Sequence, residues 1–113
     1  MLFPQQSSGY FFYNRPVDMR KSFDGLYLLV VDQLASGNLD GKIFVFVNKR
    51  KDKIKIFYFD KDGFVILYKR LEKGTFRFPS TEAKYLIISS ETLALILYGI
   101  DLKSVKKLKR FSI

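Results

Sequence analysis

The sequence contains few side chains that could carry out catalysis. It has no Cys and no His, so it lacks a thiolate nucleophile, the common general base near neutral pH and the usual zinc ligands. Asp60 and Asp62, in the stretch DKDGF, form the strongest candidate metal site. A calcium loop aligned on them fails, because it puts Tyr58 at its first position and Lys69 at its twelfth. A two-metal nuclease or transposase centre would need further carboxylates, which the spacing does not place there. We therefore predict a hairpin turn here, and no catalytic residue, metal or cofactor.

Cations are the more informative side chains. Twenty Lys and Arg against eleven Asp and Glu give a formal charge of +9, which favours a polyanionic partner, nucleic acid before an anionic membrane. Such a charge balance can also serve solubility alone. The first residues lack a secretory signal pattern, and no apolar run approaches the length of a membrane span. We expect a cytoplasmic protein that does not engage a membrane.

These cations must be positioned by one domain, because 113 residues with 48% hydrophobic content suffice for a single core. The predicted class is α+β: a mostly antiparallel sheet, with a central three-stranded meander plus short extra strands, and two helices. The expected strands are residues 10–13, 42–48, 53–59, 63–70 and 84–89, with a further edge strand ending at Pro79. The expected helices are 23–34, stopped at Gly37, and 90–98, capped by Ser89 or Ser90 and ended by Gly99. Residues 1–9 are expected to be loose, and 103–113 to form a basic tail.

Both faces of the meander are apolar. One face carries Phe44, Phe46, Phe57, Phe59, Phe64 and Ile66, and the other carries Ile43, Val45, Val47, Ile54, Ile56, Val65 and Leu67. Two interpretations follow from this pattern. Either the two helices cover opposite faces, which we favour, or one face stays partly open for a partner.

The turns of the meander gather charge at one end of the sheet. A four-residue loop KRKD and a turn DKDG pair residue 46 with 55, 48 with 53, 57 with 66, and 53 with 70. Seven cations then share a sheet end, namely Lys49, Arg50, Lys51, Lys53, Lys69, Arg70 and Lys73. Lys53 would face Arg70, which is unfavourable unless an anion or a carboxylate lies between them. The alternative is a solvated hairpin end with its cations splayed apart.

Two more groups of cations could bind anions. Ser22 is a good N-cap for the first helix, so Arg20 and Lys21 precede the helix and, with its free amides, could hold a phosphate or carboxylate. The alternative is that they pair with Asp18 and Asp24. The stretch KSVKKLKR near the end, which contains Lys106 and Lys107, is predicted to be an auxiliary anion contact, with a solubilising tail as the alternative.

Four blocks of the sequence resemble a known family. They are DMRKSFDGL (18–26), FVF (44–46), DKIKIFYFDKDGFVILYKRLEKGTFRFP (52–79) and LALILYGIDL (93–102). They are similar to the second-frame accessory protein, often called TnpB, of IS66-type insertion sequences. The resemblance implies a protein encoded beside a separate transposase and needed for movement of the element, without itself carrying the strand-transfer site. The chain departs from the family at Tyr58, Phe59 and Phe78, where tryptophans are usual, and its basic turn is rich in Lys instead of Arg.

The residues and the resemblance lead to the same functional expectation. We expect a non-catalytic accessory protein that binds DNA through its basic surface. The alternative is an adaptor that docks onto the transposase of the element with little direct DNA contact.

Overall fold

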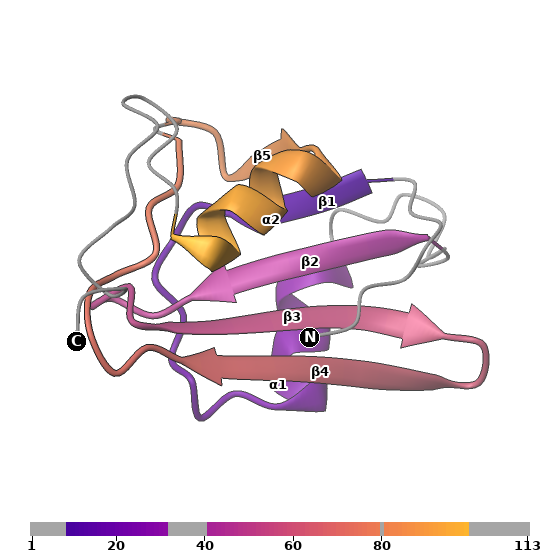
Figure 1. The fold of residues 1–113 in the computed structure, drawn as a ribbon. Helices are drawn as coiled ribbons and strands as arrows, with labels where there is room; N and C mark the ends of the chain where they lie inside the picture. Colours follow the sequence, from indigo (N-terminus) through magenta and orange to yellow (C-terminus); the bar gives the residue numbers. More distant parts are fainter. Residues whose placement is uncertain (1–8, 32–40, 80, 100–113) are drawn as a thin grey trace.

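The computed structural model of the chain describes residues 9–31, 41–79 and 81–99. In chain order the elements are β1 (Gly9–Tyr13), α1 (Phe23–Val30), β2 (Lys42–Val47), β3 (Lys53–Asp60), β4 (Gly63–Arg70), β5 (Tyr85–Ile88) and α2 (Ser90–Tyr98) (Figure 1). The predicted α+β class is confirmed. No helix in the described ranges is long and apolar enough to cross a membrane.

The five strands form one sheet in the order β4-β3-β2-β1-β5. Strand β1 is parallel to β2, and every other neighbouring pair is antiparallel. A parallel pair needs a crossover connection, and α1 lies in that connection between β1 and β2. The predicted meander is therefore the β2-β3-β4 half of the sheet, and β1 and β5 are its short extra strands.

The predicted register of the meander is confirmed. The observed partners include Phe46 with Lys55, Phe57 with Ile66 and Lys53 with Arg70. Beyond the last paired residues of β2, the Asn48 N–H donates to the Lys53 carbonyl at 3.2 Å, which continues the register into the turn. At the other end, Lys61 (φ 55°) and Asp62 connect β3 to β4, so the acidic stretch is a hairpin turn as predicted.

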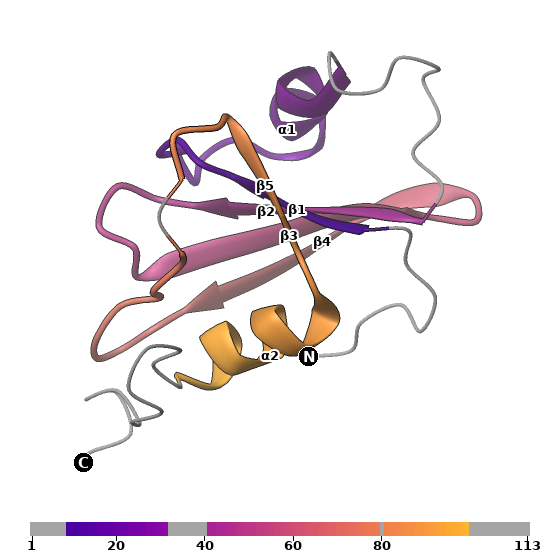
Figure 2. The ribbon, with the colours of Figure 1, turned by 90° about the horizontal axis from the view of Figure 1, so that it is seen from above.

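Each face of the sheet is covered by one helix (Figure 2). Beneath α1 the buried residues are Val17, Leu26, Val30, Phe44, Phe46 and Phe57. On the α2 side the buried cluster includes Ile43, Val45, Val47, Ile54, Ile56, Phe76, Leu93 and Ile96. The expectation that the helices cover opposite faces is confirmed.

The helix boundaries follow the predicted signals in part. The Ser89 hydroxyl accepts the Thr92 N–H at 3.1 Å, and Gly99 ends α2 in the left-handed conformation at φ 79°. Ser22 occupies the N-cap position of α1, but its side chain makes no capping hydrogen bond. The predicted continuation of the first helix to residue 34 and its stop at Gly37 lie outside the described residues.

The predicted edge strand ending at Pro79 is wrong, because residues 75–79 have no strand structure. Phe76 is fully buried, and its N–H donates to the Lys51 carbonyl in the β2–β3 turn at 2.7 Å. Phe78 stacks on Phe12 with ring centroids 3.9 Å apart. Phe76 and Phe78 therefore pack this segment against the α2 side of the sheet. The segment does not pair with an edge strand.

The burial pattern makes a direct prediction about stability. Phe46→Ala removes a ring that is fully buried beneath α1, and we expect the free energy of unfolding to fall by about 3–5 kcal/mol. Leu28→Ala is the control, because Leu28 is 70% exposed, and its effect should stay within about 0.5 kcal/mol. Urea denaturation measures both changes. Equal losses in the two variants would contradict the described packing.

Candidate nucleic-acid interface

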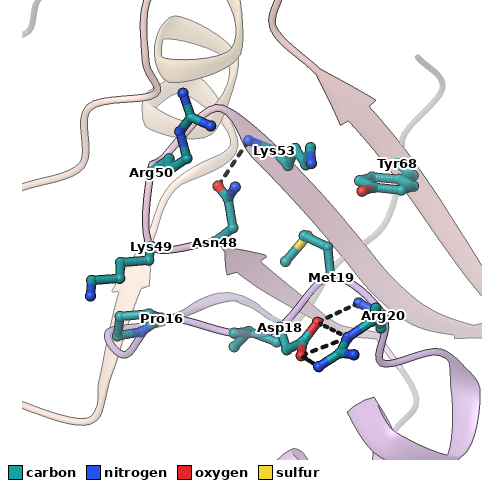
Figure 3. Close-up of a pocket in the computed structure, with 10 residues that line it drawn as sticks. Pro16, Asp18, Met19, Arg20, Asn48, Lys49, Arg50, Lys53 and Tyr68 are labelled. Atoms are coloured by element: carbon teal, nitrogen blue, oxygen red, sulfur yellow. Dashed lines mark hydrogen bonds and ion pairs between the residues drawn. The ribbon is translucent and has the colours of Figure 1, made fainter.

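A hollow of about 490 Å³ lies between the segment that precedes α1, the β2–β3 turn and strand β4 (Figure 3). We call it the basic hollow. Its charged and polar lining is Asp18, Arg20, Asn48, Lys49, Arg50, Lys53 and Tyr68. The lining therefore holds four cations and one carboxylate, from segments that are separated in the sequence.

The β2–β3 turn is organised by Asn48. Its side-chain oxygen accepts the N–H groups of Asp52 (3.1 Å) and Lys53 (3.0 Å), and its amide nitrogen donates to the Asp52 carboxylate at 2.6 Å. The hydrogen bond from Asn48 is the main reason that the pKa of Asp52 is lowered. The turn is also bonded to its neighbours, because the Asp52 carbonyl accepts the Leu71 N–H at 2.7 Å. The exposed cations Lys49 and Arg50 therefore extend from an ordered backbone.

The other wall of the basic hollow is the segment between β1 and α1. The Val17 N–H donates to the carbonyl of Val47, the last residue of β2, at 2.9 Å, and the Val17 side chain is buried. Asp18 and Arg20 follow on the surface. This attachment at Val17 places the segment beside the end of β2 where the basic turn begins.

Lys55 ties this segment to the sheet from beneath. Its side chain is on the α1 side of β3 and only 7% exposed, and its Nζ donates to the carbonyl oxygens of Met19 and Lys21, each at 2.7 Å. The Nζ also lies 4.7 Å from the centroid of the Tyr68 ring. Burial lowers the pKa of Lys55, while the charge of Asp18 opposes this change. The sequence analysis did not identify Lys55. The available signal was a Lys between Lys53 and Phe57 on the strand face that the alternation directs toward the core.

Arg20 pairs with Asp18, which was the alternative interpretation of the cations before the helix. The Asp18 carboxylate accepts the Arg20 side chain at 2.6 Å (Nη2 to Oδ2) and 3.1 Å (Nε to Oδ1), and it also accepts the Arg20 backbone N–H at 2.9 Å. These hydrogen bonds hold the pKa of Asp18 at about 2. Arg20 thus lines the basic hollow with its charge already opposed by a carboxylate (Figure 3). Lys21 is exposed just before α1 and does not line the hollow.

The seven cations predicted for one sheet end divide between its two faces. Lys53 lies opposite Arg70 as expected, and Arg70 forms an ion pair with Glu72 at 2.9 Å. Lys69 extends toward the other face, because successive residues of a strand alternate, and its Nζ donates to the Leu97 carbonyl near the end of α2 at 3.4 Å.

The remaining predicted cations lie away from the basic hollow or outside the described residues. Lys51 lines a second hollow of about 330 Å³, which lies between the β2–β3 turn and the segment around Phe78 and which also includes Arg15. Lys73 is exposed in the loop after β4. Lys106 and Lys107 lie outside the described residues. Nowhere in residues 9–31, 41–79 and 81–99 do three acidic side chains gather closely enough to hold a metal ion.

The geometry around Lys55 predicts a loss of stability on its replacement. Lys55→Met keeps an apolar side chain but leaves the Met19 and Lys21 carbonyls without their donor, so unfolding should become easier by about 1–3 kcal/mol. Lys53→Met is the matched control on the same strand face, and we expect a change within about 0.5 kcal/mol. Thermal unfolding of both variants checks this. A Lys55 variant as stable as the parent would show that these two hydrogen bonds contribute nothing.

The Asp18–Arg20 pair predicts a specific pH dependence. Folding lowers the pKa of Asp18 from 3.8 to about 2, so the pair stabilises the fold above pH 3.8 and the stabilisation is lost as the pH falls through about 2. The melting temperature of the parent should exceed that of Asp18→Asn near neutral pH, and the difference should shrink across this acidic range. High salt should also reduce this difference in melting temperature, because both groups are exposed. A difference that stays constant with pH would contradict the assignment.

Comparisons with known proteins found one matching family and two similar proteins among those compared. The family described as IS66 Orf2 like protein matches residues 8–107 of the chain. A protein of Sinorhizobium fredii (strain NBRC 101917 / NGR234), Uncharacterized protein y4jC, is 38% identical over 93 residues, which are 82% of this chain and 80% of that protein. Uncharacterized protein y4hO of the same strain is 38% identical over 84 residues, 74% of this chain and 73% of its own length. No solved structure has a significant match.

Proposed function

Because the chain belongs to the IS66 Orf2-like family, which implies an accessory role in transposition, we propose that it performs this role by binding DNA through the basic hollow. The proposal assigns the phosphate contacts to Lys49, Arg50 and Lys53, with Arg20 and Arg70 at the margins. It assigns no catalytic step to the chain, and it leaves strand transfer to a separate transposase.

The observation that carries the proposal is the unequal distribution of carboxylates around these cations. Within the described part of the chain, Arg20 and Arg70 each have an ion-pair partner, whereas Lys49, Arg50 and Lys53 have none. The Asp52 carboxylate interacts with Arg50 and Lys53 only through charge and forms no ion pair with them; it accepts a hydrogen bond from Asn48. Cations that outnumber the carboxylates beside them repel one another, and a bound phosphate relieves that repulsion.

The order of the turn gives a second line of support. Asn48 orders the turn that carries Lys49 and Arg50 through two hydrogen bonds to backbone N–H groups and one to the Asp52 carboxylate, so these residues need little further ordering when they bind. Their long side chains stay free to adapt to a phosphate backbone. Such contacts supply affinity and orientation but carry little base-sequence information. We therefore expect binding that is strongly salt dependent and nearly independent of duplex sequence.

A charge-matched pair of variants tests the proposal. The Lys49→Gln/Lys53→Gln double variant removes two proposed contacts, so the slope of log affinity against log salt should fall by about 0.9 per contact with duplex DNA, or about 0.7 with a single strand. The control is Lys42→Gln/Lys61→Gln, which removes the same charge from the opposite end of the meander. Titrations at several NaCl concentrations measure the slopes, and the control should retain the parent slope.

Two results would contradict the proposal. If the slope of log affinity against log salt falls equally in the two double variants, net charge alone drives binding. Unchanged DNA affinity in the Lys49/Lys53 variant, together with lost capture of the transposase of the element, would instead support the adaptor function.

A further inference from the structure

Tyr68 is an aromatic residue on the α1 side of β4, opposite Lys55, and it is 52% exposed. Ile66, two residues earlier on the same face, packs against the cluster beneath α1. Tyr68 instead lines the basic hollow, at the end opposite Asp18 and Lys49 (Figure 3). A single exposed aromatic ring is common on protein surfaces and does not by itself indicate a binding site. The groups around Tyr68 therefore have to supply the evidence for one.

The Tyr68 ring is held in place by the buried ammonium of Lys55. The two residues are directly opposed across β3 and β4, and Lys55 Nζ is 4.7 Å from the ring centroid, within the distance of about 6 Å for a cation–π contact. The ammonium is itself fixed by the carbonyls of Met19 and Lys21. Since Lys55 is only 7% exposed while Tyr68 is 52% exposed, the ring has one part against a rigid support and another part open to solvent.

Cations share this surface with the Tyr68 ring. Arg70 follows on the same strand face, Lys53 lies opposite Arg70, and Arg20 and Arg50 line the same hollow. The volume of about 490 Å³ is within the range of about 300–1,000 Å³ that is usual for small-ligand sites. Lys53 and Arg50 form no ion pair within the described residues, and they share the hollow with the supported ring. This combination matches the two parts of a nucleotide, since a base stacks on an aromatic ring and its phosphate binds a cation.

We propose that the basic hollow binds single-stranded DNA, with one unpaired base stacked on Tyr68 and the flanking phosphates on Lys53 and Arg50. This inference rests on the proposed DNA binding and restricts it to single-stranded DNA. In a duplex the base faces are already stacked and paired, so Tyr68 can contribute only where bases are unpaired. The protein should therefore prefer a single strand to a duplex of the same sequence.

The decisive comparison is between oligothymidine and an abasic strand with the same number of phosphates. The parent should bind oligothymidine about 5- to 150-fold more tightly, which corresponds to about 1–3 kcal/mol for one stacked base. Tyr68→Ala should lose this preference, bind the abasic strand as the parent does, and keep the parent slope of log affinity against log salt. Tyr68→Phe should retain the preference, because stacking requires the ring and not the hydroxyl. Tyr98→Ala is the matched control, since Tyr98 is 66% exposed on α2, and should behave as the parent.

Each other outcome has a definite meaning. Salt-dependent binding of both strands without a preference for bases would overturn the stacking inference and leave the proposed DNA binding intact. Failure of the parent to bind either strand or a duplex would overturn both. If Tyr68→Ala lowers the melting temperature, the same titrations are made with Tyr68→Leu, which keeps an apolar side chain but has no flat ring. A full preference for bases in the Leu variant would then refute the role of Tyr68.

Discussion

The fold depends on the fact that the meander is apolar on both faces. Phe46 and Phe57 point to one side and Ile54 and Ile56 to the other, and all four are fully buried. A sheet of this kind needs cover on both sides, and the chain supplies it with one helix before β2 and one after β5. The crossover through α1 makes β1 parallel to β2 and brings the segment before α1 over the end of β3. The basic hollow is a consequence of that route.

Among the described residues, Lys55 is the buried charged residue on the α1 side of β3, and its position links stability to the site. An ammonium in this place needs oxygen partners, and the carbonyls of Met19 and Lys21 provide them. The same contacts fix the segment that carries Asp18 and Arg20, and they support the Tyr68 ring. One buried charge thus orders two walls of the hollow, while the Asn48 hydrogen bonds order the third.

Much of this could be predicted from the sequence, for local reasons. Short turns and strict alternation determined the register of β2, β3 and β4, including Lys53 opposite Arg70. The positions of β1 and β5 in the sheet were not predictable in the same way, because they depend on pairing between distant segments. The prediction that seven cations share one sheet end was correct only in part, because side chains alternate along β4 and Lys69 lies on the α2 face. Lys55 was missed because its partners are backbone carbonyls, which no pattern of side chains reveals. The apparent strand before Pro79 arose because Phe76 alternates inward for packing alone.

The order of strands in the sheet also affects how the protein folds and which part unfolds first. Among the described strands, β5 pairs with β1 alone, with Tyr13 opposite Tyr85 and Tyr10 opposite Ile88. The meander is made of neighbouring segments, whereas the β1–β5 pairing closes a loop that contains the whole meander, so its entropic cost is larger. The meander can therefore form early in folding, and β5 with α2 can join it only after β1 is in place. Amide hydrogens of β5 should accordingly exchange together with those of β1, as one cooperative unit that opens before the meander does.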